Sequence, residues 1–278
     1  KRYISNKKET CLYLALKSSK KLLKNFNKNK IDFVIFVSQT YEKNLTTASC
    51  IIQDQVGLKK KIIAIDLNLG CSGFIYALKI GHSFFKDSNI NNGIIVCSDT
   101  YTKHISINNR SCRPIFSDGS AAILLSYSKN DKIISFNFGS DGSGTKDLYI
   151  PNTDIHNSKN NYNNILMNGS NVALFAMSEI PKSVLSHLKK TKMSLKKIDL
   201  VIFHQASKYV IDNLTRILGI SKNKVFSNYK NIGNTISSSI PIALKDAYDN
   251  RVLKNNNNVL LIGFGVGLSW GSAIIKFN

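Results

Sequence analysis

The chain has 278 residues, with 38 Lys and Arg against 17 Asp and Glu, which gives a formal net charge of +21. This length allows a sizeable core, and a hydrophobic content of 43% excludes a chain that is disordered throughout. No apolar run approaches the roughly 20 residues that a membrane-spanning helix needs, and no signal peptide is recognised. We therefore expect no membrane partner.

The positive charge does not predict a nucleic-acid partner. Only 5 of the 38 basic residues are Arg, while Asn reaches 32. The joint excess of Lys and Asn indicates compositional bias. A nucleic-acid-binding protein would be expected to have more Arg, because base readout and bidentate phosphate contacts favour Arg. The basic residues are also spread along the chain.

Five cysteines without a CxxC pair predict neither a disulfide framework nor a metal site. A reducing cytoplasm is the expected location. We interpret four of the five as small packing residues: Cys11, Cys50, Cys97 and Cys112.

Apolar periodicity predicts two similar series of helices and strands. The first series is a helix over 12–26, a strand over 31–36, a helix over 47–56, a strand over 62–66, a helix opening at Cys71, and strands over 93–97 and 119–124. The second is a strand over 132–138, a helix over 172–190, a strand over 198–203, a helix over 208–218, a short strand at 225–226, a helix opening at Asn234, and strands over 259–262 and 271–275.

An internal repeat links the two series. Residues 198–203 (Ile-Asp-Leu-Val-Ile-Phe) repeat residues 31–36 (Ile-Asp-Phe-Val-Ile-Phe) almost letter for letter. We therefore predict an α/β fold made of two duplicated halves, residues 1–130 and 131–278, with buried parallel strands and crossover helices. A strand precedes the first helix of the second half only, so an N-terminal strand of the first half is expected to be missing. The Asn-rich residues 157–164 predict a polar loop.

Three residues stand where an open α/β sheet gathers its reactive groups, after strands and before helices. Cys71 and Asn234 occupy equivalent points of the two halves, and His204 follows the repeated strand. A helix N-terminus favours a thiolate, while His and Asn can donate hydrogen bonds to an oxyanion or enolate. The alternatives are a structural cysteine, a core histidine, and a plain strand connection at 263–267.

Four motifs carry a resemblance to a known family: residues 66–74 (Asp-Leu-Asn-Leu-Gly-Cys-Ser-Gly-Phe), 204–207 (His-Gln-Ala-Ser), 233–235 (Gly-Asn-Thr) and 263–272 (Gly-Phe-Gly-Val-Gly-Leu-Ser-Trp-Gly-Ser). The sequence resembles β-ketoacyl-acyl-carrier-protein synthase III. The resemblance implies a thiolase-like fold in five α-β-α-β-α layers, and a homodimer. It implies an acyltransferase that condenses an acyl-coenzyme A primer with malonyl-acyl carrier protein in fatty acid or related acyl-chain biosynthesis.

The resemblance also implies roles for individual residues. Cys71 matches the nucleophile that becomes acylated, and His204 and Asn234 match the pair that supports decarboxylation. The backbone N–H groups of Cys71 and Val266 match the oxyanion hole. Five further residues complete the expected site: Arg110, Gly169 and Ser207 for substrate binding, and Lys208 with Arg216, which supply positive charge for carrier-protein docking. Coenzyme A enters as a thioester substrate, and no cofactor or metal is implied.

Two departures leave other functions open. The family's N-terminal strand and part of its coenzyme A site have no counterpart here, and Tyr209 stands where many members carry a docking Arg. The alternatives are acyl transfer without condensation, or a truncated, non-catalytic partner subunit.

Overall fold

The first sheet is built around a continuous apolar strand. In the computed structural model, which describes all residues except 44, 131, 152–163 and 278, every side chain of β1 (Phe33–Val37) is buried. The sheet order is β2-β1-β3-β4, with β2 (Ile63–Leu67), β3 (Asn92–Asp99) and β4 (Gly119–Ser126). β1 pairs in parallel with β2 and β3, and β4 runs antiparallel to β3.

The second sheet repeats this arrangement. Its order is β5-β11-β10-β8-β9, with β5 (Ile133–Ser140), β8 (Leu200–Phe203), β9 (Val225–Phe226), β10 (Asn258–Gly265) and β11 (Ser269–Lys276). β8 holds the place that β1 holds in the first sheet, as the internal repeat predicted. In the second sheet, β5 pairs with the outer edge of β11. In the first sheet, β4 occupies the equivalent place of β11, and no further strand pairs with it among the described residues. The division into two domains and the further N-terminal strand stay predictions.

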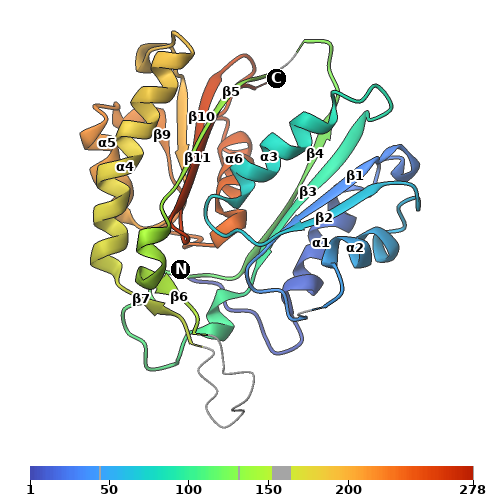
Figure 1. Ribbon diagram of the computed structural model, residues 1–278, viewed down its shortest axis with the longest axis horizontal. Helices are drawn as coiled ribbons and strands as arrows, with labels where there is room; N and C mark the ends of the chain where they lie inside the picture. Colours follow the sequence, from blue (N-terminus) through green and yellow to red (C-terminus); the bar gives the residue numbers. More distant parts are fainter. Residues whose placement is uncertain (44, 131, 152–163, 278) are drawn as a thin grey trace.

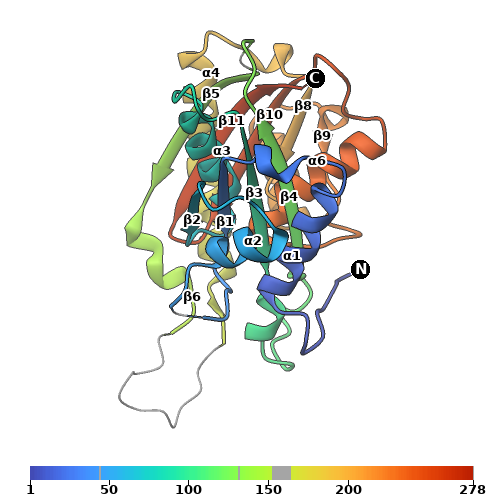
Figure 2. The ribbon, with the colours of Figure 1, turned by 90° about the vertical axis from the view of Figure 1, so that its right-hand side faces the viewer.

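The helices complete five layers (Figures 1 and 2). α3 (Gly73–Phe84) and α6 (Ser239–Asp249) lie between the two sheets, α1 (Cys11–Leu22) and α2 (Ala48–Val56) cover the first sheet, and α4 (Gly169–Lys190) and α5 (Lys208–Ile217) cover the second. Short elements connect them: β6 (Leu148–Tyr149), β7 (Leu166–Met167), and the 3₁₀ helices η1 (Lys28–Lys30), η2 (Tyr101–His104), η3 (Gly142–Asp147), η4 (Leu195–Lys197), η5 (Lys222–Lys224) and η6 (Ile236–Ser238).

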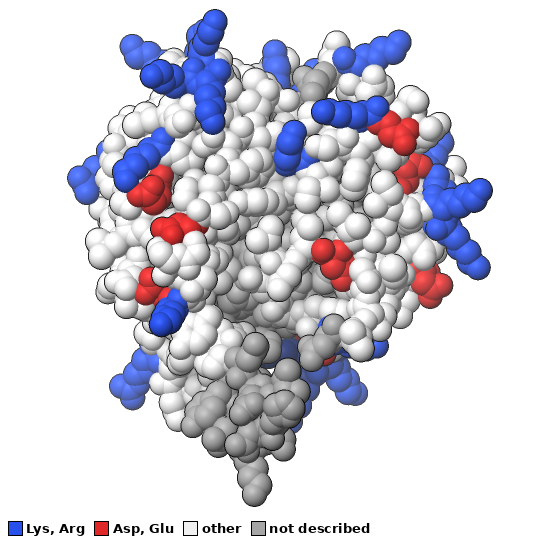
Figure 3. Space-filling model, viewed as in Figure 1, with Lys and Arg blue, Asp and Glu red and all other residues white. Residues whose placement is uncertain are grey.

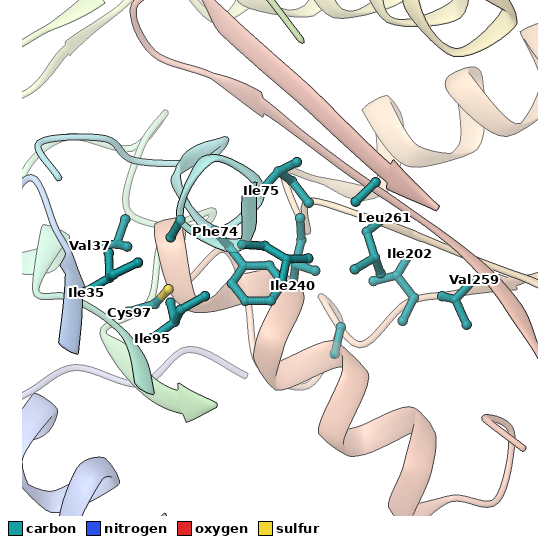
Figure 4. Close-up of a cluster of buried hydrophobic side chains, with 14 of the residues drawn as sticks. Ile35, Val37, Phe74, Ile75, Ile95, Cys97, Ile202, Ile240, Val259 and Leu261 are labelled. Atoms are coloured by element: carbon teal, nitrogen blue, oxygen red, sulfur yellow. The ribbon is translucent and has the colours of Figure 1, made fainter. Parts of the chain in front are cut away.

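The core between the sheets is made by the two central helices. Phe74 and Ile75 of α3 and Ile240 of α6 pack against Ile35 of the first sheet and Ile202 of the second (Figure 4). Burying large apolar side chains is the main favourable term in folding. This shared core fixes the two sheets against each other, and with them the loops at their carboxyl ends.

Both central helices begin later than the sequence pattern predicts. α3 begins at Gly73 and α6 at Ser239, so Cys71 and Asn234 lie in the turns before them. The apolar periodicity is the same in a tight turn as in a first helical turn, so the pattern cannot separate them. The expected polar loop at 157–164 lies almost wholly outside the described residues.

The exposure of the cysteines corrects the expectation that four of them are packing residues. Cys50 of α2 is exposed, so it is not a packing residue, whereas Cys11, Cys97 and Cys112 are buried. Within the described residues, no helix is long and apolar enough to cross a membrane. Lys and Arg side chains are scattered around the edge of the face in Figure 3, with acidic residues between them.

Candidate active site

Cys71, in the first half of the chain, packs directly against a strand of the second sheet. It follows β2 of the first sheet, and its side chain is 6% exposed. Gly263 and Gly265 of β10, in the second sheet, pack against it. A Cβ on Gly265 would lie 2.8 Å from Cys71 Sγ, and one on Gly263 would lie 2.9 Å from the Cys71 carbonyl oxygen. Only glycine permits this approach, so the glycine-rich segment at 263–267 is more than a strand connection.

Burial dominates the electrostatics of this thiol. Burial, with a smaller contribution from the Asp99 carboxylate, raises the pKa of Cys71 to about 12, while the backbone N–H groups of Val266 and Cys71 act against both by hydrogen-bonding the sulfur. The N-terminus of α3, which begins two residues later, acts in the opposite direction and favours the thiolate. With a pKa of about 12, the thiol is nevertheless protonated at neutral pH, and two backbone N–H groups lie beside it.

His204 is held as a neutral hydrogen-bond donor. It directly follows β8 and is 1% exposed, and burial lowers the pKa of its imidazole to about 3. Nδ1 lies 2.6 Å from Ser239 Oγ, and that oxygen accepts from the Gln205 backbone N–H at 3.5 Å. We assign the Ser239 hydroxyl as donor to Nδ1 and hence the imidazole proton to Nε2. The ring stands edge-on to Phe264, 5.7 Å away, between the two glycines that contact Cys71.

Asn234 is fixed by backbone pairing with the first half of the chain. Its N–H donates to the Ile115 carbonyl at 3.0 Å and its carbonyl accepts from the Ser117 N–H at 2.8 Å. Its side-chain Oδ1 accepts from the Ile236 N–H at 2.9 Å. The amide nitrogen Nδ2 is therefore the group left to donate to a substrate. The preceding Gly233 has φ +86°, a left-handed conformation that favours glycine.

A buried apolar cluster surrounds the thiol. We call it the Cys71 cluster, and its buried members are Cys71, Tyr101, Ile105, Cys112, Phe116, Leu148, Ile165 and Ile236. Partly buried Val266 and Ile115, which flanks the Asn234 pairing, pack against it. His204 packs against Phe264, whose neighbours in β10, Gly263 and Gly265, contact Cys71. The three side chains picked out by the sequence thus gather around one apolar region at the carboxyl ends of both sheets.

A cavity of about 470 Å³ leads to Asn234. Its lining includes Ser207 and Lys208, which the sequence assigned to substrate binding and docking, together with three further basic residues: Lys1, Arg2 and Lys230. Lys208 also forms an ion pair with Asp212 on the same helix, which offsets part of its charge. A cavity with this lining suits a ligand that carries phosphate groups.

Three other assigned residues lie outside this lining. Arg110 is exposed in the loop before β4, Gly169 is the exposed first residue of α4, and Arg216 is exposed in the last turn of α5. Arg216 donates to Asn213 Oδ1 at 3.1 Å. Their binding roles stay predictions.

Sequence reasoning missed the residues that position the site. Ser239 Oγ hydrogen-bonds His204 Nδ1, and Gln205 Oε1 holds the segment after β9 by accepting from the Asn228 N–H at 2.9 Å. Tyr101 and Gln39 form a hydrogen bond close to the thiol. These hydrogen bonds join residues that are far apart in the chain. In the sequence, the one pattern that points to any of them is the run of three serines at 237–239.

Comparison with known proteins gives consistent matches along the chain. Sequence models described as 3-oxoacyl-[acyl-carrier-protein] synthase III and as its C-terminal region match residues 65–142 and 188–277. A β-ketoacyl-[acyl-carrier-protein] synthase III of Clostridium perfringens is 36% identical over 286 aligned positions, which cover 99% of this chain and 87% of that protein. The enzyme of the same name from Trichodesmium erythraeum is 32% identical, covering 100% of this chain and 87% of its own.

Solved structures agree with the sequence matches. A crystal structure of a 3-oxoacyl-(acyl-carrier-protein) synthase III superimposes with a TM-score of 0.93 at 28% identity, covering 99% of this chain and 88% of that one. The synthase III of Aquifex aeolicus gives 0.91 at 29% identity, covering 99% and 87%. The five layers are therefore the thiolase-like fold. With the matched motifs around Cys71, His204 and Asn234, the chain belongs to the β-ketoacyl-acyl-carrier-protein synthase III family of acyltransferases.

Proposed function

We propose that this chain condenses an acyl-coenzyme A primer with malonyl-acyl carrier protein, giving 3-oxoacyl-acyl carrier protein, carbon dioxide and free coenzyme A. The main support is the buried thiol that shares one apolar region with two backbone donors, a neutral imidazole and a side-chain amide. Such preorganised donors in a dry site are the largest contribution in many acyl-transfer reactions.

In the first half-reaction, Cys71 Sγ attacks the thioester carbonyl carbon of the primer. The oxyanion that forms accepts hydrogen bonds from the Cys71 and Val266 N–H groups. The bond between carbonyl carbon and coenzyme A sulfur then breaks, and coenzyme A leaves with the thiol proton. The high pKa of Cys71 makes proton loss part of this step rather than a prior equilibrium.

In the second half-reaction, the malonyl thioester oxygen accepts from His204 Nε2–H and Asn234 Nδ2–H. The carbon–carbon bond between the malonyl methylene and its carboxylate breaks, and carbon dioxide leaves. The electron pair of that bond forms the enolate. The enolate carbon attacks the acyl carbonyl on Cys71, and the Cys71 thiolate leaves and takes up a proton. His204 needs no charge for this role, which fits its lowered pKa.

Partners follow from the same reaction. We infer that Ser207, with the basic cavity, receives the phosphate-bearing arm common to coenzyme A and the carrier protein. We assign Arg110 and Gly169 to that arm, and Lys208 and Arg216 to docking of the acidic carrier protein. A homodimer in the cytoplasm that needs no external cofactor completes the proposal.

The test is to incubate the protein with isotopically labelled acetyl-coenzyme A and locate the label by peptide mass spectrometry. We expect label on Cys71, and none on that peptide in Cys71→Ala. Carbon dioxide release from malonyl-carrier protein should stop in His204→Ala while acylation of Cys71 persists. Acylation without carbon dioxide release by wild type would favour plain acyl transfer, and no acylation at any thiol would favour a non-catalytic subunit.

A further inference from the structure

Ser72, the residue after Cys71, has a hydroxyl that does not cap the helix it precedes. It occupies the N-cap of α3, where a serine commonly accepts a hydrogen bond from the first helical turn, but its side chain makes no such bond. The residue is only 1% exposed. Its Oγ lies 2.7 Å from Ser269 Oγ, and the two residues are 197 positions apart in the sequence. The hydroxyl therefore links the turn that carries the nucleophile to the second half of the chain.

Ser269, the first residue of β11, extends this contact to Val266. Its Oγ donates to the Val266 carbonyl oxygen at 2.9 Å. A hydroxyl has one proton and a carbonyl can only accept, so the Ser269 proton is used in this bond. We therefore assign Ser72 as the donor between the two serines. The hydrogen bonds run in one direction, from Ser72 to Ser269 to Val266, and we call the two residues the serine pair.

Val266 is thereby held to the nucleophile turn at both of its backbone polar groups. Its N–H is one of the two that hydrogen-bond the Cys71 sulfur, and its carbonyl accepts from the serine pair. Because Ser72 directly follows Cys71, these contacts form a closed ring. The other N–H beside the sulfur belongs to Cys71 itself. The two donors thus come from different halves of the chain, and the serine pair fixes one relative to the other.

The turn that contains Val266 shows why a side-chain restraint is needed. On one side of it, Gly265 at the end of β10 packs against Cys71. On the other side, Leu268 exchanges backbone hydrogen bonds of 2.8 and 3.0 Å with Asp141. Gly267 between them is exposed. The serine pair restrains Val266 on the inner side of this turn, where the sulfur lies.

We propose that Ser72 and Ser269 are positioning residues that hold the Val266 N–H in place beside Cys71, so that donors from both halves meet at one oxyanion. This inference rests on the proposed acylation of Cys71 and names the residues that organise its oxyanion hole. The serines act through Val266. An oxyanion donor is effective only at about 3 Å from the oxygen that gains charge, so a small displacement of Val266 weakens it. Loss of the pair should therefore slow acylation without weakening the binding of acyl-coenzyme A.

The experiment follows a single turnover of Cys71 acylation by acetyl-coenzyme A, at a series of concentrations, by intact-protein mass spectrometry. Ser269→Ala removes both hydrogen bonds, and its maximal rate should fall about 10- to 100-fold, somewhat less than the loss of a whole donor. The half-saturating concentration should change less than about twofold, because the donor acts on charge that forms in the transition state. All of the protein should still become acylated, whereas a misfolded fraction would lower the final extent.

Three further variants test the pair itself. Ser72→Ala leaves the bond from Ser269 to Val266, so the rate should fall by less, about three- to tenfold. The double variant should be no slower than Ser269→Ala, because both serines act through the same carbonyl. Ser269→Thr keeps the hydroxyl and should restore most of the rate. Ser19→Ala is the matched control: Ser19 lies on α1, is fully buried and donates to the Ala15 carbonyl at 2.8 Å, and its loss should leave the rate unchanged.

The outcomes separate this inference from the proposed function. If folded Ser269→Ala acylates Cys71 at the wild-type rate, or if Ser269→Thr is as slow as Ser269→Ala, the inference is wrong while acylation of Cys71 stands. Effects of the two serines that multiply in the double variant would also overturn it. If acetyl-coenzyme A does not label Cys71 in wild type, the proposed function fails, and this inference fails with it. Should Ser269→Ala not fold by circular dichroism, Ser72→Ala decides, and an unchanged rate in that variant contradicts the inference.

Discussion

At the scale of residues, the site combines two groups that are both uncharged at neutral pH. Burial raises the pKa of Cys71 to about 12 and lowers that of His204 to about 3. A thiolate–imidazolium pair is therefore not the resting state of the site. In the proposed reaction, hydrogen-bond donors held in place by the backbone and by Ser239 would supply the stabilisation instead, by acting on charge that develops during the reaction.

The raised pKa of Cys71 predicts a steep pH dependence for its alkylation. Only the thiolate reacts with iodoacetamide, so the rate should rise about tenfold per pH unit from about pH 7 to about pH 10. No plateau is expected, because the pKa lies near 12. The measurement is the rate of loss of the unmodified Cys71 peptide by mass spectrometry, with the Cys71→Ala protein as the control for other thiols. A plateau below about pH 9 would contradict the raised pKa.

The sequence singles out the candidate reactive residues more readily than the side chains that position them. Cys71, His204 and Asn234 follow strands, and a strand end is readable from apolar periodicity. Tyr101, Gln39 and Ser239 could not be predicted in the same way, because their roles depend on hydrogen bonds between elements far apart in the chain. The burial of Cys71 also depends on Gly263 and Gly265 of the other sheet, and no local pattern reports a pKa set by such packing.

At the scale of elements, α4 is attached to the second sheet through one buried histidine. His187 Nε2 lies 2.7 Å from Ser135 Oγ of β5, and its Nδ1 lies 2.7 Å from Ser272 Oγ of β11. Burial lowers the pKa of His187 to about 4, and nearby Lys190 adds to the effect. The neutral ring thus joins the helix to two strands.

This histidine predicts a loss of stability in acid. The unfolded chain takes up the proton near pH 6.5, whereas the folded protein takes it up only near pH 4. Stability linked to His187 is therefore complete above about pH 6.5 and falls as the pH approaches 4. Urea unfolding at pH 7 and 4.5 should show that wild type loses roughly 2 to 3 kcal/mol more than His187→Gln. Equal losses in the two proteins would show that His187 does not contribute, since His204 and Asp99 titrate in both.

Strands were easier to predict than helix starts for a physical reason. β1 and β8 are continuous apolar runs buried on both faces, a pattern that few other structures share. Helix starts depend on the turn before them. Gly73 N–H bonds the Gly70 carbonyl at 2.8 Å, which makes Cys71 part of a turn and delays α3. That hydrogen bond leaves no trace in the periodicity.

At the scale of the whole molecule, the net charge of +21 would assist encounter with an acidic carrier protein. Most of the positive charge is spread over the molecule. The effect of a charge at the docking surface therefore has to be separated from the effect of the net charge. Arg216 is the better probe, because Lys208 is already paired with Asp212.

Charge reversal at two exposed sites separates the specific and general effects. Arg216→Glu should lower kcat/KM for malonyl-carrier protein about tenfold at low salt, since it places repulsion at the docking surface. Lys20→Glu on α1 makes the same change in net charge and should have a much smaller effect. Both effects should shrink in about 0.5 M salt, where screening is strong. Equal effects of the two variants would mean that only net charge matters.

The close contact of Gly265 with Cys71 also bears on oxidative damage. Peroxide oxidises cysteine through its thiolate and adds an oxygen atom to the sulfur. Because β10 packs against one side of the sulfur, we expect an oxidant to arrive by the route that the substrate uses. A resident acyl group then occupies that route, so the acylated protein is expected to be resistant to peroxide, while the exposed Cys50 reacts first. The packing that shapes the active site thereby makes substrate turnover itself a form of protection for the thiol.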